Sequence, residues 1–266
     1  AVDQEGGMVQ RLRHRNGFRS FLSPQTVQEK LSTAQAYIHY SKMASDLRSV
    51  GFNLNFGVLL DLYYPNAIFA KSKRSYSSNP IITYHYAKAM IRAHKDQGII
   101  AVAKHFPGHG SSLKDTHHHA ADITKTWKKS EVIPYRLLIQ DNVLSMVMSA
   151  HLTHRDIDAQ YPASLSTAFL NQKLREDYAY AGVIISDDLQ MQAIRSQYPL
   201  KTTVIQALNA GTDILLFGNV DQENPQLVAR IHRIIREALK TGELSMEQID
   251  MAYARVMALK ASLTSP

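Results

Sequence analysis

A sixteen-residue stretch of the chain is rich in histidine. KHFPGHGSSLKDTHHH, from Lys104 to His119, holds five of the twelve histidines, together with one proline and one aspartate. Proline and glycine disfavour a strand or a core helix, so we predict a loop. Within it, Asp115 and His117 are two residues apart, and in an extended chain their side chains point the same way. A carboxylate that holds one imidazole nitrogen leaves the other for proton transfer, which makes the pair a candidate general acid/base.

Two other interpretations of this loop stay open on the residues alone. The histidines could lie in a solvated loop without a role, and we interpret His118 and His119 in this way. They could also hold a metal ion, through His105, His109, His117 and His119. Proline and glycine between His105 and His109 forbid the helix in which a four-residue spacing makes a zinc-binding pair. We therefore expect no metal and no other cofactor.

A second group of candidate residues follows the apolar run GVII. Ser186, Asp187 and Asp188 come directly after it. Side chains of successive residues point apart, so at most one of the two carboxylates can face a ligand. The other is expected to cap the next helix or to bind backbone. An aspartate at a strand end can be a nucleophile, a metal ligand or a cap, and the residues alone leave these roles open.

Both groups follow elements that the apolar pattern predicts. Continuous apolar runs indicate parallel strands that are buried on both faces, and they lie at 52–62, 99–106, 145–152, 182–189 and 212–219. Amphipathic segments predict helices at 32–49, 79–98, 128–142, 166–177, 200–210, 223–240 and 245–263. Strands that alternate with helices indicate an α/β fold with a parallel sheet and right-handed crossovers.

The polar residues after these runs favour one form of that fold. They are Asp3, Asp61, Lys104, His105, His151, Asp187, Asp188 and Asn219. In a (β/α)8 TIM-type barrel the carboxyl ends of all strands meet at one mouth, whereas an open sheet gathers ligands at one switch point. We therefore predict a barrel that forms one domain over 1–266. About six strands can be counted, so we expect the first strand and helix to be missing from this chain.

The composition excludes several classes of protein. The chain is 45% hydrophobic and 20% charged, and no apolar run reaches the eighteen or so residues of a membrane span. It contains no cysteine, which excludes disulfides and thiolate chemistry. The net charge is +7, but the basic residues are scattered, so we expect no nucleic-acid partner. A dinucleotide fingerprint and a Walker lysine are both absent.

The motifs, taken together, resemble glycoside hydrolase family 3, in particular the single-domain β-N-acetylglucosaminidases of the NagZ type. The matching segments occur in the order of the family and cover nearly the whole chain. They are VDQEGG (2–7), QRL (10–12), NFGVLLD (55–61), KRSYSSNP (73–80), KHFPGHGSSLKDTHH (104–118), SAHL (149–152), PASLS (162–166), GVIISDDLQM (182–191) and NAGTDILLF (209–217). KHFPGHG followed by DxH and then by SDDL is a highly specific combination.

This resemblance implies a barrel fold and a retaining exo-β-N-acetylglucosaminidase. Asp187 stands at the nucleophile position of the family and would form a covalent glycosyl-enzyme. His117, oriented by Asp115, would protonate the leaving oxygen and then deprotonate the incoming water. An imidazole, with a pKa of about 6.5, suits both roles and adds no second negative charge beside the nucleophile.

The resemblance also implies a set of residues around the substrate. Five match positions that bind the terminal sugar: Asp3, Arg11, Arg74, Lys104 and His105. Three are expected to support the site: Asp61, His109 and His151. The family usually has a basic residue after VDQEGG, where this chain has Met8, so one contact or brace of the family is in question here.

The implied partner is a small carbohydrate, a GlcNAc-terminated peptidoglycan fragment or chito-oligosaccharide, bound by a monomer. The bacterial cytoplasm and the cell envelope both remain open as locations. Two alternatives to hydrolysis also remain. A histidine acid/base would not repel phosphate, so the protein could be a GlcNAc-glycoside phosphorylase, and it could also be a non-catalytic relative that binds sugar or adheres to the envelope.

Overall fold

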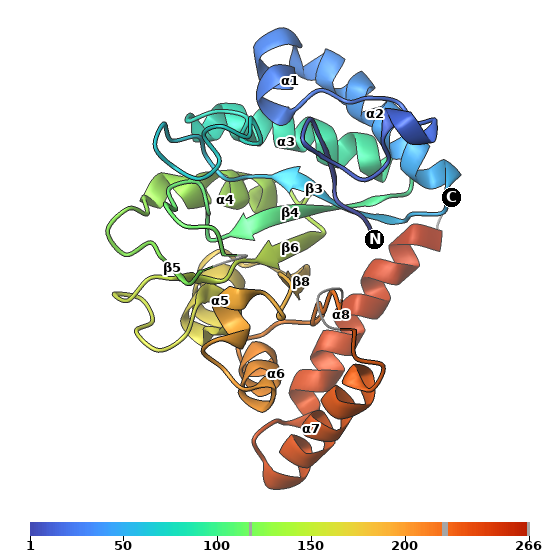
Figure 1. The fold of residues 1–266 in the computed structure, drawn as a ribbon. Coiled ribbons are helices and arrows are strands. Elements are labelled where there is room, and N and C mark those ends of the chain that lie inside the picture. The colour runs from blue at the N-terminus through green and yellow to red at the C-terminus, as the bar shows by residue number, and fades with distance from the viewer. Residues whose placement is uncertain (117–118, 220–222, 265–266) are drawn as a thin grey trace. The chain divides into compact units, whose positions relative to one another are not determined.

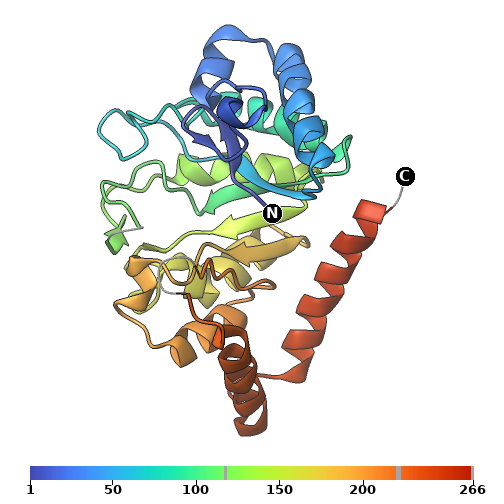
Figure 2. The same ribbon diagram turned by 45° about the vertical axis from the view of Figure 1, so that its right-hand side comes forward.

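Strands and helices alternate along the chain (Figures 1 and 2). The computed structural model describes residues 1–116, 119–219 and 223–264. They fall into two compact units. The first consists of Ala1–Leu113, Thr126–Met148 and Ala261–Pro266, and the second of Lys114–Lys125 and Ser149–Lys260.

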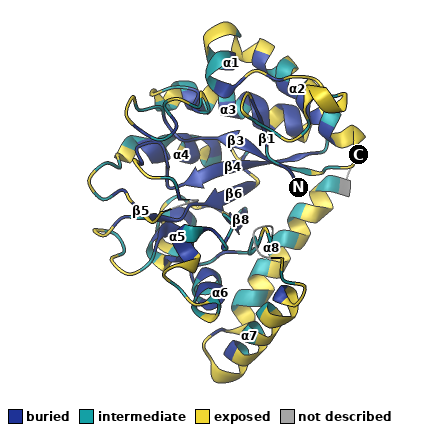
Figure 3. Cartoon of the chain, viewed as in Figure 1, coloured by how far each residue is buried: buried dark blue, intermediate teal, exposed yellow. Residues whose placement is uncertain are grey.

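The first unit is built on three neighbouring strands. These are β3 (Leu54–Leu59), β4 (Ile100–Phe106) and β6 (Met146–Ser149), which lie side by side in that order. β3 and β4 are parallel, and both are buried over nearly their whole length (Figure 3). Because both faces are covered, their sequences LNFGVL and IAVAKHF show no polar alternation before the strand end. A short antiparallel pair, β1 (Gln4–Gly6) and β2 (Val9–Gln10), precedes them.

Helices cover this sheet, and local sequence signals set where they begin. The unit contains η1 (His14–Asn16), α1 (Pro24–Lys30), α2 (Thr33–Ser49), α3 (Pro80–Lys95), η2 (Lys129–Val132) and α4 (Ile133–Gln140). Ser32 and Gln35 form a capping box that starts α2. The Asn79 side chain caps α3, and Pro80 occupies its first turn. α3 packs against α2, α4, β3 and β4, so it ties the helical layer to the strands.

The second unit has shorter strands and the longest helix. Its strands are β5 (Ala121–Asp122), β7 (Leu152–Thr153) and β8 (Val183–Ser186), and β5 pairs with β7 in parallel. Its helices are η3 (Ala163–Leu165), the π-helical η4 (Ala168–Asp177), α5 (Gln192–Arg195), α6 (Leu200–Asn209), α7 (Leu227–Thr241) and α8 (Met246–Thr264). Asp213, which is buried, binds both Arg175 and Arg255, and these ion pairs join η4 to α8.

The α/β prediction is confirmed, and barrel closure stays a prediction. The predicted strand at 212–219 is wrong in extent, because only Ile214 forms a bridge, to Ile185. Further along, the Leu216 N–H donates to the Ser186 hydroxyl at 2.9 Å and not to a carbonyl, which interrupts a regular ladder. In the part of the chain that the structure describes, no helix combines the length and apolar character needed to span a membrane.

Candidate active site

Glu5 belongs to a cluster of four charged side chains in the first unit. The Arg74 guanidinium donates to both carboxylate oxygens of Glu5, at 2.8 and 2.7 Å. Lys104 Nζ lies 2.8 Å from Glu5 Oε1 and donates to Asp3 Oδ1, also at 2.8 Å. Burial raises the pKa of Glu5, but the Lys104 and Arg74 charges outweigh burial and hold it at about 2. Glu5 therefore stays ionised between the two cations.

Strand geometry fixes this cluster. Lys104 is near the carboxyl end of β4, and Glu5 is in β1. The Gln4 N–H donates to Asn55 Oδ1 at 3.0 Å, and the Asn55 amide donates back to the Gln4 carbonyl at 2.9 Å, which fastens β1 to β3. The Arg74 guanidinium lies 4.5 Å from the centre of the Phe69 ring, a cation–π contact that limits its rotation.

Asp61 organises the two histidines of the KHFPGH motif. Its carboxylate accepts from the His105 ring at 2.7 Å and from the backbone N–H groups of His105 and His109 at 3.2 and 2.7 Å. Burial raises the pKa of Asp61, but the contacts with His105 more than offset it, so the pKa is lowered. Since a carboxylate accepts from Nδ1, the His105 proton sits on that nitrogen. Asp61 itself is fully buried, and the His105 ring stacks on Phe69.

The loop after β4 is packed against the segment that precedes α4. The Trp127 indole N–H donates to the Pro107 carbonyl at 3.1 Å, and Glu131 accepts from the Ser111 N–H at 3.3 Å. A Cβ at Gly110 would lie 2.2 Å from the Leu62 carbonyl oxygen, and one at Gly108, where φ is +116°, would lie 2.5 Å from Glu131 Cβ. The two glycines are therefore required by close approach. Burial raises the pKa of Glu131 to about 7.

Asp187 and Asp188 follow β8 in the second unit and have different surroundings. The Asp188 carboxylate accepts from the N–H groups of Gln190 and Gly218, at 2.9 and 3.0 Å. The expectation that one of the two carboxylates binds backbone is confirmed for Asp188, although Asp187 also accepts one backbone N–H. Asp187 Oδ1 accepts the Asp188 N–H at 2.8 Å, and the Asp187 N–H donates to the Ser149 carbonyl at 3.0 Å. Asp187 is partly exposed.

His151 holds the segment that carries these aspartates. One ring nitrogen lies 2.9 Å from the Asp188 carbonyl and the other 2.7 Å from the Ser164 hydroxyl. A carbonyl can only accept, so Nε2 carries the proton and Nδ1 accepts from Ser164. With 1% of its surface exposed, His151 is a buried brace between η3 and the residues after β8.

The predicted acid/base pair is only partly within the described residues. His117 and His118 lie outside them. Asp115 is partly exposed, and its carbonyl accepts the His119 N–H at 2.9 Å. The buried Thr116 accepts the Ala193 N–H through its carbonyl at 3.3 Å, which fastens this loop to α5. The pairing of Asp115 with His117 stays a prediction.

The structure brings Asp3, Arg74 and Lys104 together, but Arg11 differs from them. Its backbone N–H donates to Gln4 Oε1 at 2.8 Å, while its guanidinium is exposed and has no partner among the described residues. Met8 is exposed as well. Across 1–116, 119–219 and 223–264, no three His, Asp or Glu side chains are grouped so that they could hold a metal ion.

Sequence reasoning missed two buried carboxylates of this site. Glu5 lies inside the VDQEGG motif. It is fully buried, but no local pattern in the sequence indicates this burial. Glu131 stands in KKSEV, where neighbouring lysines suggest a solvated turn. The apolar residues Val132 and Ile133, which precede Pro134 at the start of α4, are the local signals that this segment turns inward.

Comparison with known proteins agrees with this α/β fold. The glycosyl hydrolase family 3 N terminal domain matches residues 1–259. The chain therefore belongs to glycosyl hydrolase family 3, as the motifs predict.

Three relatives are similar over most of this chain. A β-hexosaminidase of Tolumonas auensis is 36% identical over 82% of the chain and 66% of its own length. β-Hexosaminidase A of Pseudoalteromonas piscicida is 28% identical over 99% of the chain and 47% of its own length. The structure of a family 3 β-N-acetylglucosaminidase from Paenibacillus sp. str. FPU-7 superposes with a TM-score of 0.90 at 30% identity, covering 98% of this chain and 49% of that one. The chain thus spans between about half and two thirds of the length of these relatives.

Proposed function

We propose that this chain is a retaining exo-β-N-acetylglucosaminidase that removes terminal GlcNAc from peptidoglycan fragments. The Asp187 carboxylate attacks the anomeric carbon while the glycosidic bond breaks and His117 gives its proton to the leaving oxygen. Water then attacks the glycosyl-Asp187 ester, His117 takes the proton of that water, and the sugar leaves with its original anomeric configuration. Asp115 orients the imidazole throughout.

One observation carries the proposal: Asp187 follows β8 directly and is partly exposed, with its Oδ1 held by the Asp188 N–H at 2.8 Å. Asp188 instead uses its carboxylate on the backbone N–H groups of Gln190 and Gly218. A partly exposed carboxylate at a strand end that is held by a backbone N–H is oriented for attack.

The Glu5 cluster supports recognition of the sugar. Lys104 uses two of its three N–H donors on Asp3 and Glu5, and Arg74 uses Nε and one terminal nitrogen on Glu5. Each cation keeps a donor for a hydroxyl, and the partly exposed Asp3 offers an acceptor. Vicinal hydroxyls of a pyranose bind such paired donors and acceptors well.

The names of the relatives support the choice of sugar. Two are β-hexosaminidases and one is a β-N-acetylglucosaminidase. Peptidoglycan fragments are the substrate class implied by the motifs, and a chito-oligosaccharide is the alternative to be compared in the assay.

The test is hydrolysis of an aryl N-acetyl-β-glucosaminide by the full-length protein, with release of the aryl alcohol as the readout. Asp187→Asn is expected to lower kcat by about 10³-fold or more, since the nucleophile is lost. Asp177→Asn, in an exposed ion pair with Lys173, is the matched control and should retain activity.

The covalent step is tested separately. A 2-deoxy-2-fluoro or 5-fluoro glycoside traps the glycosyl-enzyme, and mass spectrometry of its peptides should locate the sugar on Asp187. A label on another residue, or equal activity of Asp187→Asn and Asp177→Asn, would overturn the proposal. Comparison of GlcNAc-anhydro-N-acetylmuramic acid with chitobiose, each with and without phosphate, then separates substrate classes and hydrolysis from phosphorolysis.

A further inference from the structure

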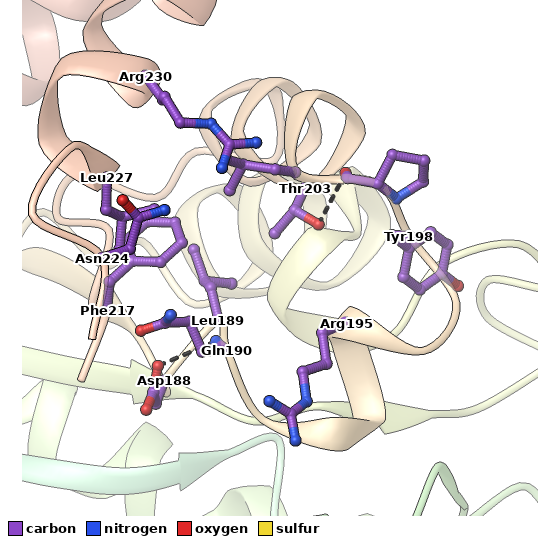
Figure 4. Close-up of a pocket in the computed structure, with 12 residues that line it drawn as sticks. Asp188, Leu189, Gln190, Arg195, Tyr198, Thr203, Phe217, Asn224, Leu227 and Arg230 are labelled. Atoms are coloured by element: carbon purple, nitrogen blue, oxygen red, sulfur yellow. Dashed lines mark hydrogen bonds between the residues drawn. The ribbon is translucent and has the colours of Figure 1, made fainter. Parts of the chain in front are cut away.

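A pocket of about 300 Å³ lies within the second unit, apart from the residues that the proposed reaction uses (Figure 4). It is formed by the segment after β8, the end of α5, the starts of α6 and α7, and the side chains of Phe217 and Asn224. Asp188 lines it, but Asp187 does not. The pocket therefore borders the loop of the proposed nucleophile without including the nucleophile itself.

One side of the pocket is apolar and rigid. Leu189 and Leu227 are buried. Leu189 belongs to a core cluster on which Tyr198 and Phe217 also pack. The Tyr198 hydroxyl donates to the Gln160 carbonyl at 2.8 Å, which fixes the ring. A preformed apolar surface with two aromatic rings suits the flat body of a small ligand, and a volume of this size is at the lower end of ligand pockets.

The charged groups of the pocket are unbalanced. Arg195 and Arg230 stand at opposite ends of it in Figure 4, and neither has an ion-pair partner among the described residues. Arg195 Nε donates to Gln192 Oε1 at 2.8 Å. This bond orients the guanidinium and leaves its two terminal nitrogens as donors for a ligand. Asp188, the acidic residue of the lining, accepts two backbone N–H groups. Two cations thus face one carboxylate that is already hydrogen-bonded.

The neutral polar groups add more donors. Gln190 Oε1 accepts the Asn219 N–H at 2.6 Å, and Asn224 Oδ1 accepts the Gln226 N–H at 3.0 Å. With their oxygens used, both side chains keep their NH₂ groups for another acceptor. Two helices also begin at the pocket, α6 with Leu200 and α7 with Leu227, and neither has a side-chain cap. Their positive ends reinforce the two arginines.

We propose that this pocket binds a small ligand that carries an oxyanion, a carboxylate or a phosphate, on a flat apolar body. The oxyanion contacts Arg195 or Arg230 together with the amide donors, because arginine and NH₂ groups match the geometry of such oxygens. The apolar body lies against Phe217 and Leu189. Binding here needs no catalysis and so does not depend on the proposed hydrolysis.

Calorimetric titration of the full-length protein tests the site with three probes: phenyl phosphate, benzoate and the uncharged benzyl alcohol. At least one anion is expected to bind, and benzyl alcohol at least tenfold more weakly. Stronger binding of phenyl phosphate identifies a phosphate ligand, and stronger binding of benzoate a carboxylate. If neither anion binds, or if benzyl alcohol binds equally well, the proposal is overturned.

Variants locate the binding. Arg195→Gln and Arg230→Gln should each weaken the anion at least fivefold. Arg233 is exposed, lies on α7 like Arg230 and does not line the pocket. The affinity of Arg233→Gln for the anion should therefore stay within twofold of that of the unmutated protein. Asp187→Asn should keep the affinity, and saturating GlcNAc should not displace the probe. An equal loss in Arg233→Gln, or displacement by GlcNAc, would show nonspecific charge binding or binding at the substrate position and would refute the pocket.

Discussion

The pKa values of two buried glutamates in the first unit are shifted in opposite directions, and the difference lies in their partners. Glu5 and Glu131 are both fully buried. Glu5 has two cations within hydrogen-bond distance, so its pKa falls to about 2. Burial raises the pKa of Glu131 to about 7 and the negative charge of Asp61 adds to this rise, while the hydrogen bonds from Ser111 and Lys128 offset only part of it. The first carboxylate is ionised for binding, and the second is close to titration at neutral pH.

The pKa of Glu131 predicts a pH dependence of stability. The unfolded carboxyl loses its proton near pH 4.5 and the folded one near 7, so the free energy of unfolding should fall as pH rises across this window and then level off. The full difference corresponds to about 3 kcal/mol. Glu131→Gln cannot ionise, so this fall of the free energy of unfolding with pH should disappear. The loss of one N–H contact would lower the free energy of unfolding equally at every pH and would not create a slope.

Urea unfolding at pH 5, 6, 7 and 8 measures the Glu131 effect. The control is Glu29→Gln, an exposed glutamate on α1, which should leave the slope of the original protein unchanged. If Glu131→Gln unfolds with the same pH dependence as the unmutated chain, then Glu131 is not the group that titrates.

At the level of elements, the loop after β4 depends on a close approach between Gly110 and Leu62. A Cβ at position 110 would meet the Leu62 carbonyl oxygen at 2.2 Å and its nitrogen at 2.7 Å. Gly110→Ala must therefore displace the loop or the chain after β3, and we expect a loss of about 2 to 3 kcal/mol of stability. Because residues 115–117 follow this loop, hydrolysis should fall about tenfold as well.

Gly17→Ala provides the comparison for Gly110→Ala. Gly17 has a φ of +85°, but a Cβ there would meet no atom within 4 Å. Alanine at this position should cost about 1 kcal/mol through backbone strain alone and leave activity unchanged. Thermal unfolding and the aryl glycoside assay on both variants separate the two effects, and similar results for the two would argue against a contact specific to Gly110.

The elements that the sequence predicts well are those that a single local signal specifies. Continuous apolar runs located β3, β4 and β8, and caps such as Asn79 with Pro80 located the start of α3. The run at 212–219 has the same apolar character, yet its ladder is interrupted where the Ser186 hydroxyl takes the Leu216 N–H. Which hydrogen-bond partner a strand meets depends on a distant residue, and a local pattern does not contain that information.

The candidate site shows the same limit. Its catalytic candidates could be proposed because Asp115, His117 and Asp187 occur in specific motifs. Glu5 and Glu131 could not be ranked, since a glutamate that is buried beside Lys104 and one that is buried without a cation look alike in sequence. Burial and charge partners arise only when separate elements meet.

For the whole molecule, the scattered basic residues predict a kinetic effect that no single residue shows. The chain carries a formal charge of +7, and the peptidoglycan fragments proposed as substrate carry carboxylates, so long-range attraction should raise their association rate. Salt screens this attraction over a Debye length of about 10 Å at 0.1 M. Raising sodium chloride from about 0.02 to 0.5 M should lower kcat/KM for a muropeptide about three- to tenfold. The uncharged chitobiose should change by less than about twofold, and an equal response of the two substrates would mean that the net charge does not steer binding.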